Sequence, residues 1–164
     1  MSRIGVIADT HGLLRPEVFD VFSGVDLILH AGDIGGPELL EELRAFAPVH
    51  AVWGNTDGFD LRRTLPEVFE QEIEGLSFVV AHGHQLGSPT PENLTERWPD
   101  ALVIIYGHTH RPLLTLVDRV VTVMNPGGAG RRRFDLPPSV GILELEPGIP
   151  PRGRLVPLLP AGED

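Results

Sequence analysis

Residues 3–12 read Arg-Ile-Gly-Val-Ile-Ala-Asp-Thr-His-Gly, a short apolar run that ends in an aspartate and a histidine. A run of this length, rich in β-branched residues, predicts a buried strand over residues 3–8. Because successive side chains of a strand alternate between its faces, Asp9 and His11 can point to the same side. The stretch therefore predicts a strand that delivers a carboxylate and an imidazole at its carboxyl end.

Four more apolar runs follow the same plan, each with a polar candidate ligand at or shortly after its end. The runs cover residues 26–31, 49–53, 76–81 and 101–106, and the residues that follow them are Asp33, Asn55, His82 and His108. In open α/β sheets, ligands collect at the carboxyl ends of the strands. Five strand ends that carry Asp, Asn and His therefore predict a metal site at one edge of the fold.

The remaining pattern predicts the fold class. Helical spacing or a leading proline predicts helices over residues 16–22, 37–46 and 91–98. Further strands are expected over residues 68–74, 113–117, 120–124 and 140–145. A hairpin is expected around Gly75. Strands alternate with helices in the first half and dominate the second. This order predicts an α/β fold, a four-layer α-β-β-α sandwich in which two mixed sheets pack face to face with helices outside.

Length and composition set the outer bounds. With 164 residues we expect one domain, residues 1–164, whose Pro/Gly-rich end from residue 147 is either a frayed tail or an edge strand near 155–158. The net charge of −10 argues against a stable nucleic-acid complex. No apolar run is long enough for a membrane span, and no signal peptide precedes the first strand. We therefore expect a cytoplasmic protein with no membrane partner.

The donor types indicate which ions would bind. There is no cysteine, so any metal must be held by nitrogen and oxygen ligands. The candidate ligands are Asp9, His11, Asp33, Asn55, His82, His108 and His110. Such donors suit Mn, Fe, Zn or Ni better than calcium, and seven of them suit two ions that share a carboxylate. Glycines precede Asp33, Asn55 and His108 and are expected to permit the sharp turns that aim these side chains.

Six short blocks carry a family resemblance. They are Asp9-Thr10-His11-Gly12, His30-Ala31-Gly32-Asp33, Gly54-Asn55-Thr56-Asp57, His82-Gly83-His84, Gly107-His108-Thr109-His110 and Asn125-Pro126-Gly127-Gly128. Each block is weak alone, but the ordered set is specific. On these blocks the chain resembles the calcineurin-like metallophosphoesterases, and among them the small bacterial and archaeal phosphodiesterases of the YfcE-like group.

The resemblance implies a role for each ligand. Asp9, His11 and His110 would hold one ion, Asn55, His82 and His108 a second, and Asp33 would bridge them. A hydroxide between the ions would attack phosphorus in line, in a small phosphodiester or phosphomonoester. Asp33 and Asn55 would thus serve catalysis as well as binding. Manganese is the favoured metal, with nickel, iron, cobalt and zinc as alternatives.

Two departures from the family pattern bear on the mechanism. Thr56 stands where larger relatives carry a histidine that assists the leaving group, which leaves the general acid open between Asp57 and His84. Gly128 stands where relatives often carry serine, so no hydroxyl is expected there.

Several alternatives stay open. His82 and His84 compete for one ligand position, and His82 is preferred because it directly ends an apolar run. His30 is expected to be a hydrogen-bonded core residue.

The three arginines at residues 131–133 form either a solvated loop or a contact to substrate phosphate. A catalytically silent scaffold similar to the retromer subunit Vps29 is the competing function. A homo-oligomer formed through an edge strand is also expected.

Overall fold

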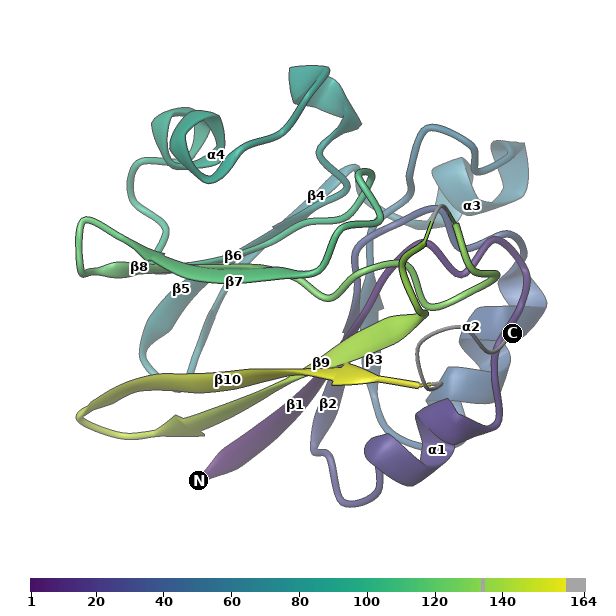
Figure 1. Ribbon diagram of the computed structural model, residues 1–164, viewed down its shortest axis with the longest axis horizontal. Helices are drawn as coiled ribbons and strands as arrows, with labels where there is room; N and C mark the ends of the chain where they lie inside the picture. The colour runs from purple at the N-terminus through teal and green to yellow at the C-terminus, as the bar shows by residue number, and fades with distance from the viewer. Residues whose placement is uncertain (134, 159–164) are drawn as a thin grey trace.

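A computed structural model describes residues 1–133 and 135–158, whose strands form two five-stranded mixed sheets (Figure 1). Sheet A holds, in spatial order, β10 (Ile149–Pro157), β9 (Ser139–Glu146), β1 (Ser2–Ile7), β2 (Leu27–His30) and β3 (Val49–Ala51). Sheet B holds β4 (Val68–Ile73), β5 (Leu76–Ala81), β6 (Val103–Ile105), β8 (Val121–Asn125) and β7 (Leu113–Val117). Both sheets are mixed because each has antiparallel strands beside a parallel centre.

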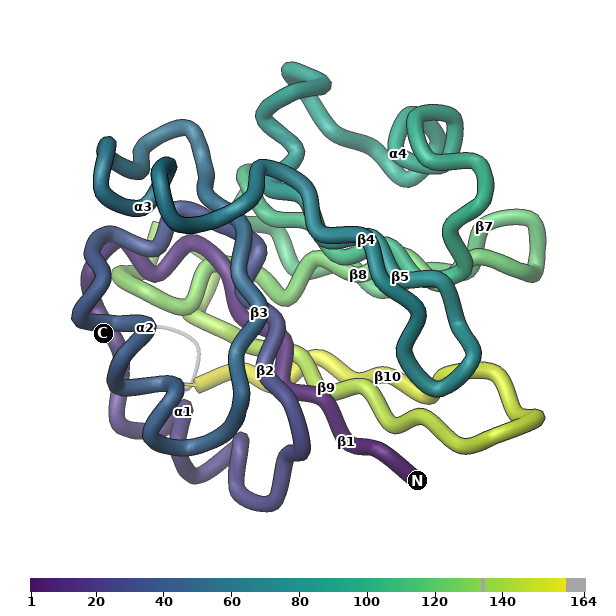
Figure 2. The backbone as a smooth tube through the Cα atoms, turned by 180° about the vertical axis from the view of Figure 1, so that it is seen from behind, coloured from purple at the N-terminus to yellow at the C-terminus, as the bar shows by residue number. Residues whose placement is uncertain are grey.

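The parallel centres of the two sheets set the position of the site. In sheet A, β1 pairs in parallel with β2, and β2 with β3. In sheet B, β5, β6 and β8 are parallel in the same way. Figure 2, the view from behind, shows β1, β2 and β3 side by side. Parallel strands bring their carboxyl ends to one edge, so each sheet presents three such ends.

Apolar side chains pack the two sheets against each other. Ile4, Val6 and Leu29 of sheet A pack against Phe78 and Val80 of sheet B, and all five are buried. On the outer faces, helices α1 (Glu17–Val21) and α2 (Pro37–Arg44) cover sheet A, and α4 (Pro91–Arg97) covers sheet B (Figure 1). The four-layer sandwich predicted from the sequence is confirmed. In the described part of the chain, no helix has both the length and the apolar character needed to cross a membrane.

The helices begin where their local sequence directs. Proline occupies the first helical position of α2 and α4, where its missing N–H costs no hydrogen bond. Thr90 caps α4 in a reciprocal pair with Asn93. Helix α2 ends at Arg44, two residues before the predicted end. Phe46, the last residue of the predicted range, is 41% exposed and packs on Phe19.

Two short elements were not predicted from the sequence. Helix α3 (Phe59–Thr64) buries only Leu61, so its sequence shows no apolar periodicity. The short 3₁₀ turn η1 (His84–Leu86) buries no residue. At the other end of the chain, β10 is an edge strand of nine residues, longer than the predicted one. Pro150 and Pro151 lie where the register with β9 shifts, and Pro157 ends the strand. The expectation for residues 159–164 lies outside the described residues.

Candidate metal centre

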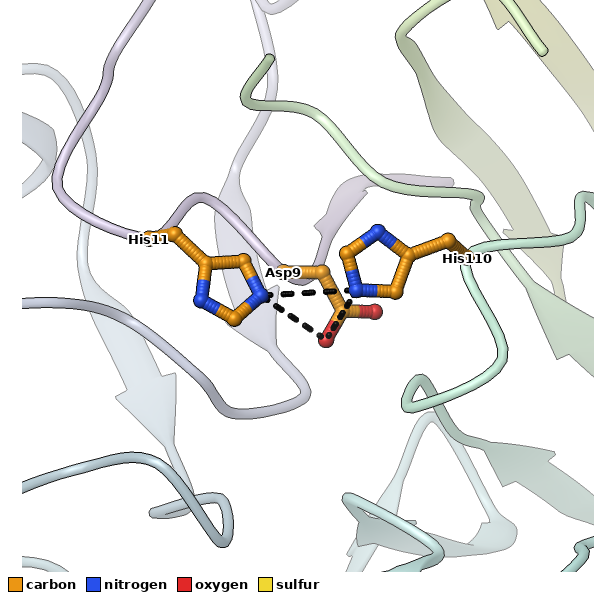
Figure 3. A group of neighbouring side chains, drawn as sticks. All are labelled: Asp9, His11 and His110. Carbon is orange, nitrogen blue, oxygen red and sulfur yellow. Dashed lines mark hydrogen bonds and ion pairs between the residues drawn. The ribbon is translucent and has the colours of Figure 1, made fainter. Parts of the chain in front are cut away.

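The first group of ligands gathers around one buried carboxylate. The Oδ1 atom of Asp9 lies 3.6 Å from Nε2 of His110 and 4.0 Å from Nε2 of His11 (Figure 3). The two imidazoles are stacked, with 3.4 Å between their Nε2 atoms. Asp9 follows β1 of sheet A, whereas His110 follows β6 of sheet B. The two sheets therefore supply this group together, as a cation would require.

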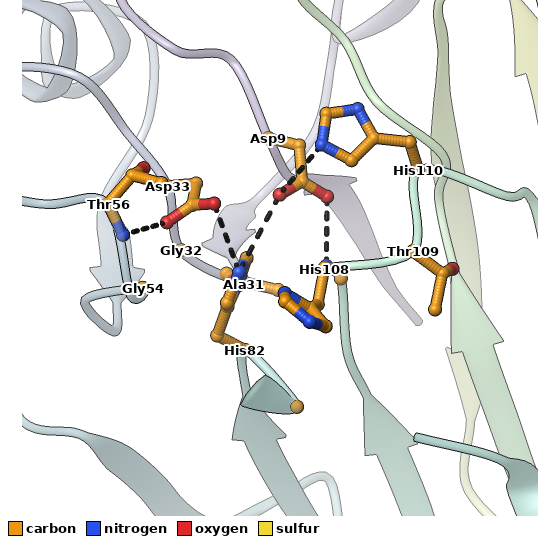
Figure 4. Close-up of polar contacts among 12 residues, drawn as sticks. Asp9, Ala31, Gly32, Asp33, Gly54, Thr56, His82, His108, Thr109 and His110 are labelled. Atoms are coloured by element: carbon orange, nitrogen blue, oxygen red, sulfur yellow. Dashed lines mark hydrogen bonds and ion pairs between the residues drawn. The ribbon is translucent and has the colours of Figure 1, made fainter. Parts of the chain in front are cut away.

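The second group joins Asp9 and Asp33 through His82. Nε2 of His82 lies 3.2 Å from Oδ2 of Asp33 and 3.8 Å from Oδ1 of Asp9 (Figure 4). Oδ2 of Asp33 is also 3.7 Å from Nε2 of His11. Oδ2 of Asp33 therefore faces both His82, a predicted ligand of one ion, and His11, a predicted ligand of the other. This position suits a carboxylate that is shared between two ions.

Backbone conformation aims these side chains. Five of the predicted ligands have positive φ angles, namely Asp9 (52°), His11 (46°), Asp33 (53°), His108 (72°) and His110 (60°). The left-handed region is unfavourable for residues with a Cβ atom, and such strain clusters at functional sites. The other described non-glycine residues with positive φ, Glu74, Asp118 and Arg119, lie in hairpin turns. The centre therefore holds strain that hydrogen bonds and packing around it must support.

The glycines that precede three of the ligands matter mainly because they lack a side chain. Gly32 has φ +97° and makes the turn expected of it. Gly54 and Gly107 do not have positive φ; a Cβ on Gly54 would clash with Asp33, and one on Gly107 would lie 3.0 Å from Oδ2 of Asp9. The chain turns at both positions, where the Asp57 N–H donates to the Gly54 carbonyl and the Thr109 N–H to the Gly107 carbonyl, but neither turn needs a positive φ at the glycine. The missing side chain instead lets neighbouring strand ends approach closely.

Most of the imidazoles are neutral and ready to coordinate. Burial lowers the pKa of His11 and His108, and burial together with the Arg133 charge lowers that of His110 to about 4. Metals bind the neutral imidazole, so no proton blocks these residues at neutral pH.

Asp9 and His82 behave differently in the metal-free protein. Burial raises the pKa of Asp9 to about 7. Burial works to lower the pKa of His82, but Asp33 and Asp9 beside it outweigh that effect and raise it. For Asp33, burial is outweighed by His82 and by the Thr56 N–H, so its pKa falls below the ordinary value. The site therefore holds protons that a bound cation would displace.

Two atoms at the centre test whether the residues fit a metal. Oδ1 of Asp9 and Nε2 of His82 are buried and have no hydrogen-bond partner among the described residues. A buried polar atom without a partner is costly, and metal coordination is one way to satisfy it. Nδ1 of His82 lies 2.8 Å from the Ala31 carbonyl oxygen, which directs Nε2 toward the carboxylates. The donor set and the orphaned atoms fit divalent cations.

Three other predicted site residues lie around this group. The His108 ring is 5.2 Å from the His82 ring, and its backbone N–H donates to Oδ2 of Asp9 at 3.0 Å. Asn55 follows β3 at the same edge, is exposed, and accepts a hydrogen bond on its carbonyl from Arg62. The His84 ring lies 5.4 Å from His82 and 5.5 Å from Trp53. The compact groups of potential ligands include neither His108 nor His84.

Asp57 occupies an anchoring position. Its Oδ2 accepts the backbone N–H groups of Ile34 (3.2 Å) and Gly54 (2.9 Å), and its Oδ1 accepts that of Gly35 (3.0 Å). The side chain thus ties the loop after β3 to the loop that carries Asp33. Asp57 is buried, and its two oxygens face the backbone donors.

Two further residues support the centre: His30 is the hydrogen-bonded core residue expected from the sequence, whereas the role of Asn125 was not recognised. His30 is buried, accepts the Gly32 N–H on Nδ1, and lies 3.0 Å from the Thr10 hydroxyl through Nε2. Because Nδ1 accepts, Nε2 carries the proton and donates to Thr10. The amide of Asn125, at the end of β8, donates to the Gly107 carbonyl and to Thr109. Asn125 thus holds the loop of His108 and His110, and its strand-end position was the signal for that role.

Known proteins share both sequence and fold with this chain. Residues 2–148 match the model of the calcineurin-like phosphoesterase superfamily domain. A probable metallophosphoesterase of Methanothermobacter thermautotrophicus is 38% identical over 151 residues, 87% of this chain and 86% of that protein. A phosphodiesterase of Methanocaldococcus jannaschii is 30% identical over 163 residues, 88% of this chain and 93% of that protein.

Solved structures give the same likeness. YfcE, a phosphoesterase from E. coli, has a TM-score of 0.68 at 26% identity, covering 87% of this chain and 88% of its own. Vps29 of Entamoeba histolytica, in complex with zinc, has a TM-score of 0.74 at 26% identity, covering 96% of this chain and 99% of its own.

Proposed function

This chain belongs to the calcineurin-like phosphoesterase superfamily, and from that membership we propose that it is a phosphodiesterase with a dinuclear metal site. The observation that carries the proposal is the convergence of Asp9, Asp33 and three histidines at one site. Within it, Oδ1 of Asp9 and Nε2 of His82 are buried and have no hydrogen-bond partner among the described residues. The similarity to an archaeal phosphodiesterase favours diesters as the substrate class.

The geometry supports an assignment of ligands to two ions. Asp9, His11 and His110, which lie close together, would hold the first ion. His82, with His108 and Asn55 beside it, would hold the second, and Asp33 would be shared. When bound, such a pair polarises phosphoryl oxygens and lowers the pKa of water toward neutrality. Mixed oxygen and imidazole donors suit manganese, which is our proposed metal.

The chain's own residues supply orientation and proton transfer. Asp33 stays ionised because His82 and the Thr56 N–H favour its charged form once the cost of burial is met. For the proton that the leaving group needs, we favour His84 over Asp57. His84 is half-buried beside His82, and its Nδ1 has no partner in the described structure, whereas the oxygens of Asp57 are occupied by backbone donors.

Turnover with defined metals tests the proposal. The protein, freed of metal and then loaded with Mn, Ni, Co, Zn or Mg, is assayed on bis-p-nitrophenyl phosphate and p-nitrophenyl phosphate, with metal content measured by elemental analysis. We expect two ions per chain and faster turnover of the diester, with manganese the best metal. Metal-loaded protein that hydrolyses neither ester would contradict the proposal.

A silent scaffold similar to Vps29 is the second candidate, favoured by the structural likeness. Since that Vps29 was solved with zinc, metal binding alone cannot separate the two functions. Hydrolysis can, and so can its loss when Asp33 is changed.

A further inference from the structure

The chain that follows β8 passes directly over the metal centre. The Ala129 N–H donates to the Ala8 carbonyl at 3.0 Å, and the Gly130 N–H to the Asp9 carbonyl at 3.4 Å. A Cβ on Gly128 would lie 2.7 Å from Nδ1 of His110, and one on Gly130 would clash with the Thr10 carbonyl. Glycines at 128 and 130 thus let this segment lie against the residues that hold the proposed first ion.

The segment then leaves the centre as three arginines. Arg131 and Arg133 line a small recess together with His110 and Gly128. A bridge between Arg133 and Leu136 fixes the backbone where the run ends.

An exposed arginine next to a cation site needs an explanation. Arginine is always charged, and bound divalent ions would repel it. The chain carries 23 acidic residues, yet no carboxylate in the described part forms an ion pair with Arg133. An anion that sits between the metals and the guanidinium would turn this repulsion into attraction. The planar guanidinium fork matches the oxygens of a phosphoryl group.

We propose that Arg133 is a specificity-determining residue that binds a phosphoryl oxygen of the substrate, on the His11 and His110 side of the centre. The inference rests on the proposed function, because the substrate must be an anionic phosphate ester. It resolves the alternatives for residues 131–133 in favour of substrate contact. The neighbouring Arg131 lines the same recess and adds positive potential.

Binding of inorganic phosphate to the metal-loaded protein tests this role without relying on turnover. The Kd is measured by calorimetry for the wild type, Arg133→Ala and Arg133→Lys, with metal content determined in parallel. The matched control is Arg154→Ala, which removes the same charge from an exposed position on β10. We expect Arg133→Ala to weaken phosphate binding by about tenfold or more, because a charge-assisted hydrogen bond is lost. Arg133→Lys should recover part of the affinity, and Arg154→Ala should match the wild type.

The outcomes separate this inference from the proposed function. Equal phosphate affinity in wild type and Arg133→Ala, with both fully loaded with metal, overturns the role of Arg133 and leaves the phosphodiesterase intact. An equal loss in Arg154→Ala overturns it too, since the effect would then be one of net charge. A wild-type protein that binds no metal, or binds metal and hydrolyses neither ester, overturns the proposed function and this inference with it.

Discussion

The aspartates and the histidines of the metal centre are held in different ways. Each aspartate has a backbone donor: the His108 N–H for Asp9, the Thr56 N–H for Asp33, and three N–H groups for Asp57. The histidines pack on one another instead, with ring centroids 5.2 Å apart for both the His11–His110 and the His82–His108 pair. Two of them also meet a backbone carbonyl, His82 that of Ala31 and His108 that of Gly87.

This difference indicates which half of the centre is formed before a metal arrives. Like-charged carboxylates repel one another, and N–H donors offset that repulsion in the folded chain. The imidazoles are mostly neutral, so they can lie side by side without such donors. We therefore expect the carboxylate half to be rigid in the metal-free protein and the imidazole half to be completed by metal. The following variants test this view.

The largest effect is expected from Asp33. Asp33→Asn keeps the shape but removes the charge that faces His11 and His82. We expect kcat/KM for the diester to fall by about a thousandfold or more, beyond the roughly 10–100-fold typical of changes to residues that only orient the metal ligands. Asp118→Asn is the matched control, since Asp118 is an exposed turn aspartate with a similar φ of 51°. Retained activity and two bound ions in Asp33→Asn would remove Asp33 from the centre.

A smaller, substrate-dependent effect is expected from His84, on the imidazole side. If it donates a proton, His84→Ala should slow a diester with an alkoxide leaving group by about a hundredfold. Nitrophenolate leaves without help, so bis-p-nitrophenyl phosphate should be much less affected. Comparing kcat on the two esters provides the measurement. Equal slowing of both esters would assign His84 a structural role, and the same comparison on Asp57→Ala examines the other candidate.

The next largest effect is expected from Asp57, which anchors the loops on the carboxylate side. Asp57→Asn leaves one oxygen for three backbone donors and turns an amide toward at least one N–H. We expect metal affinity to fall by some tens of fold, as is typical when a residue that holds metal ligands in place is changed, and stability to fall by about 1–3 kcal/mol. Denaturant unfolding of the metal-free protein and metal titration measure the two effects. Asp60→Asn, exposed on α3, is the control with the same charge change. A normal unfolding curve for Asp57→Asn would refute the anchoring role.

Metal binding should release protons from one residue of each half. Asp9 has a pKa of about 7 in the metal-free protein and that of His82 is raised, so both hold protons below neutral pH. A metal must displace these protons, and its apparent affinity should therefore rise with pH, about tenfold per pH unit for each proton released, with the contribution of Asp9 levelling off above about pH 7. Calorimetric titrations in two buffers of different ionisation enthalpy count the protons. An affinity that does not change between pH 5 and 7 would contradict this protonation scheme.

The sequence predicted the layers and the strand ends for a clear physical reason. Buried strands such as β1 and β5 are continuous apolar runs, and each ends where a polar ligand begins. That pattern placed Asp9, Asp33 and His82 at one edge, where the structure brings them together. Helix α3 gave no such signal because Leu61 is its single buried residue.

What the sequence could not reveal is set by tertiary contacts. The positive φ angles of Asp9 and Asp33 depend on hydrogen bonds from other strand ends, and nothing local in the sequence prescribes them. Asp57 could be read as a proton donor because the three N–H groups that it accepts come from distant loops and from Gly54. Likewise, the close approach at Gly54 is visible only once Asp33 is seen to pack against it.

The smallest predicted effect comes from one arginine of α3 that supports the carboxylate side from outside. Nε of Arg62 donates to the Asp57 carbonyl at 2.8 Å, and Nη2 donates to the Asn55 carbonyl at 2.9 Å, while its guanidinium lies 4.6 Å from the Trp53 ring centroid. Arg62→Ala frees the loop that carries Asn55. We expect kcat/KM and affinity for the second ion to fall about fivefold, the effect of losing about 1 kcal/mol of hydrogen bonding.

The next residue provides the control for this variant. Arg63 is on the same helix and is also exposed, but its guanidinium lies over the ring of Phe59, which is itself 72% exposed. Arg63→Ala removes the same charge without freeing either carbonyl, so it should behave as the wild type, and Arg62→Lys should fall between. If both alanine variants lose activity equally, the effect is one of charge, and the backbone of the Asn55 loop is held without Arg62. If Arg62→Ala alone loses affinity for the second ion, the carboxylate half extends outward to the surface of α3, and its rigidity is shared by residues that never touch the metal.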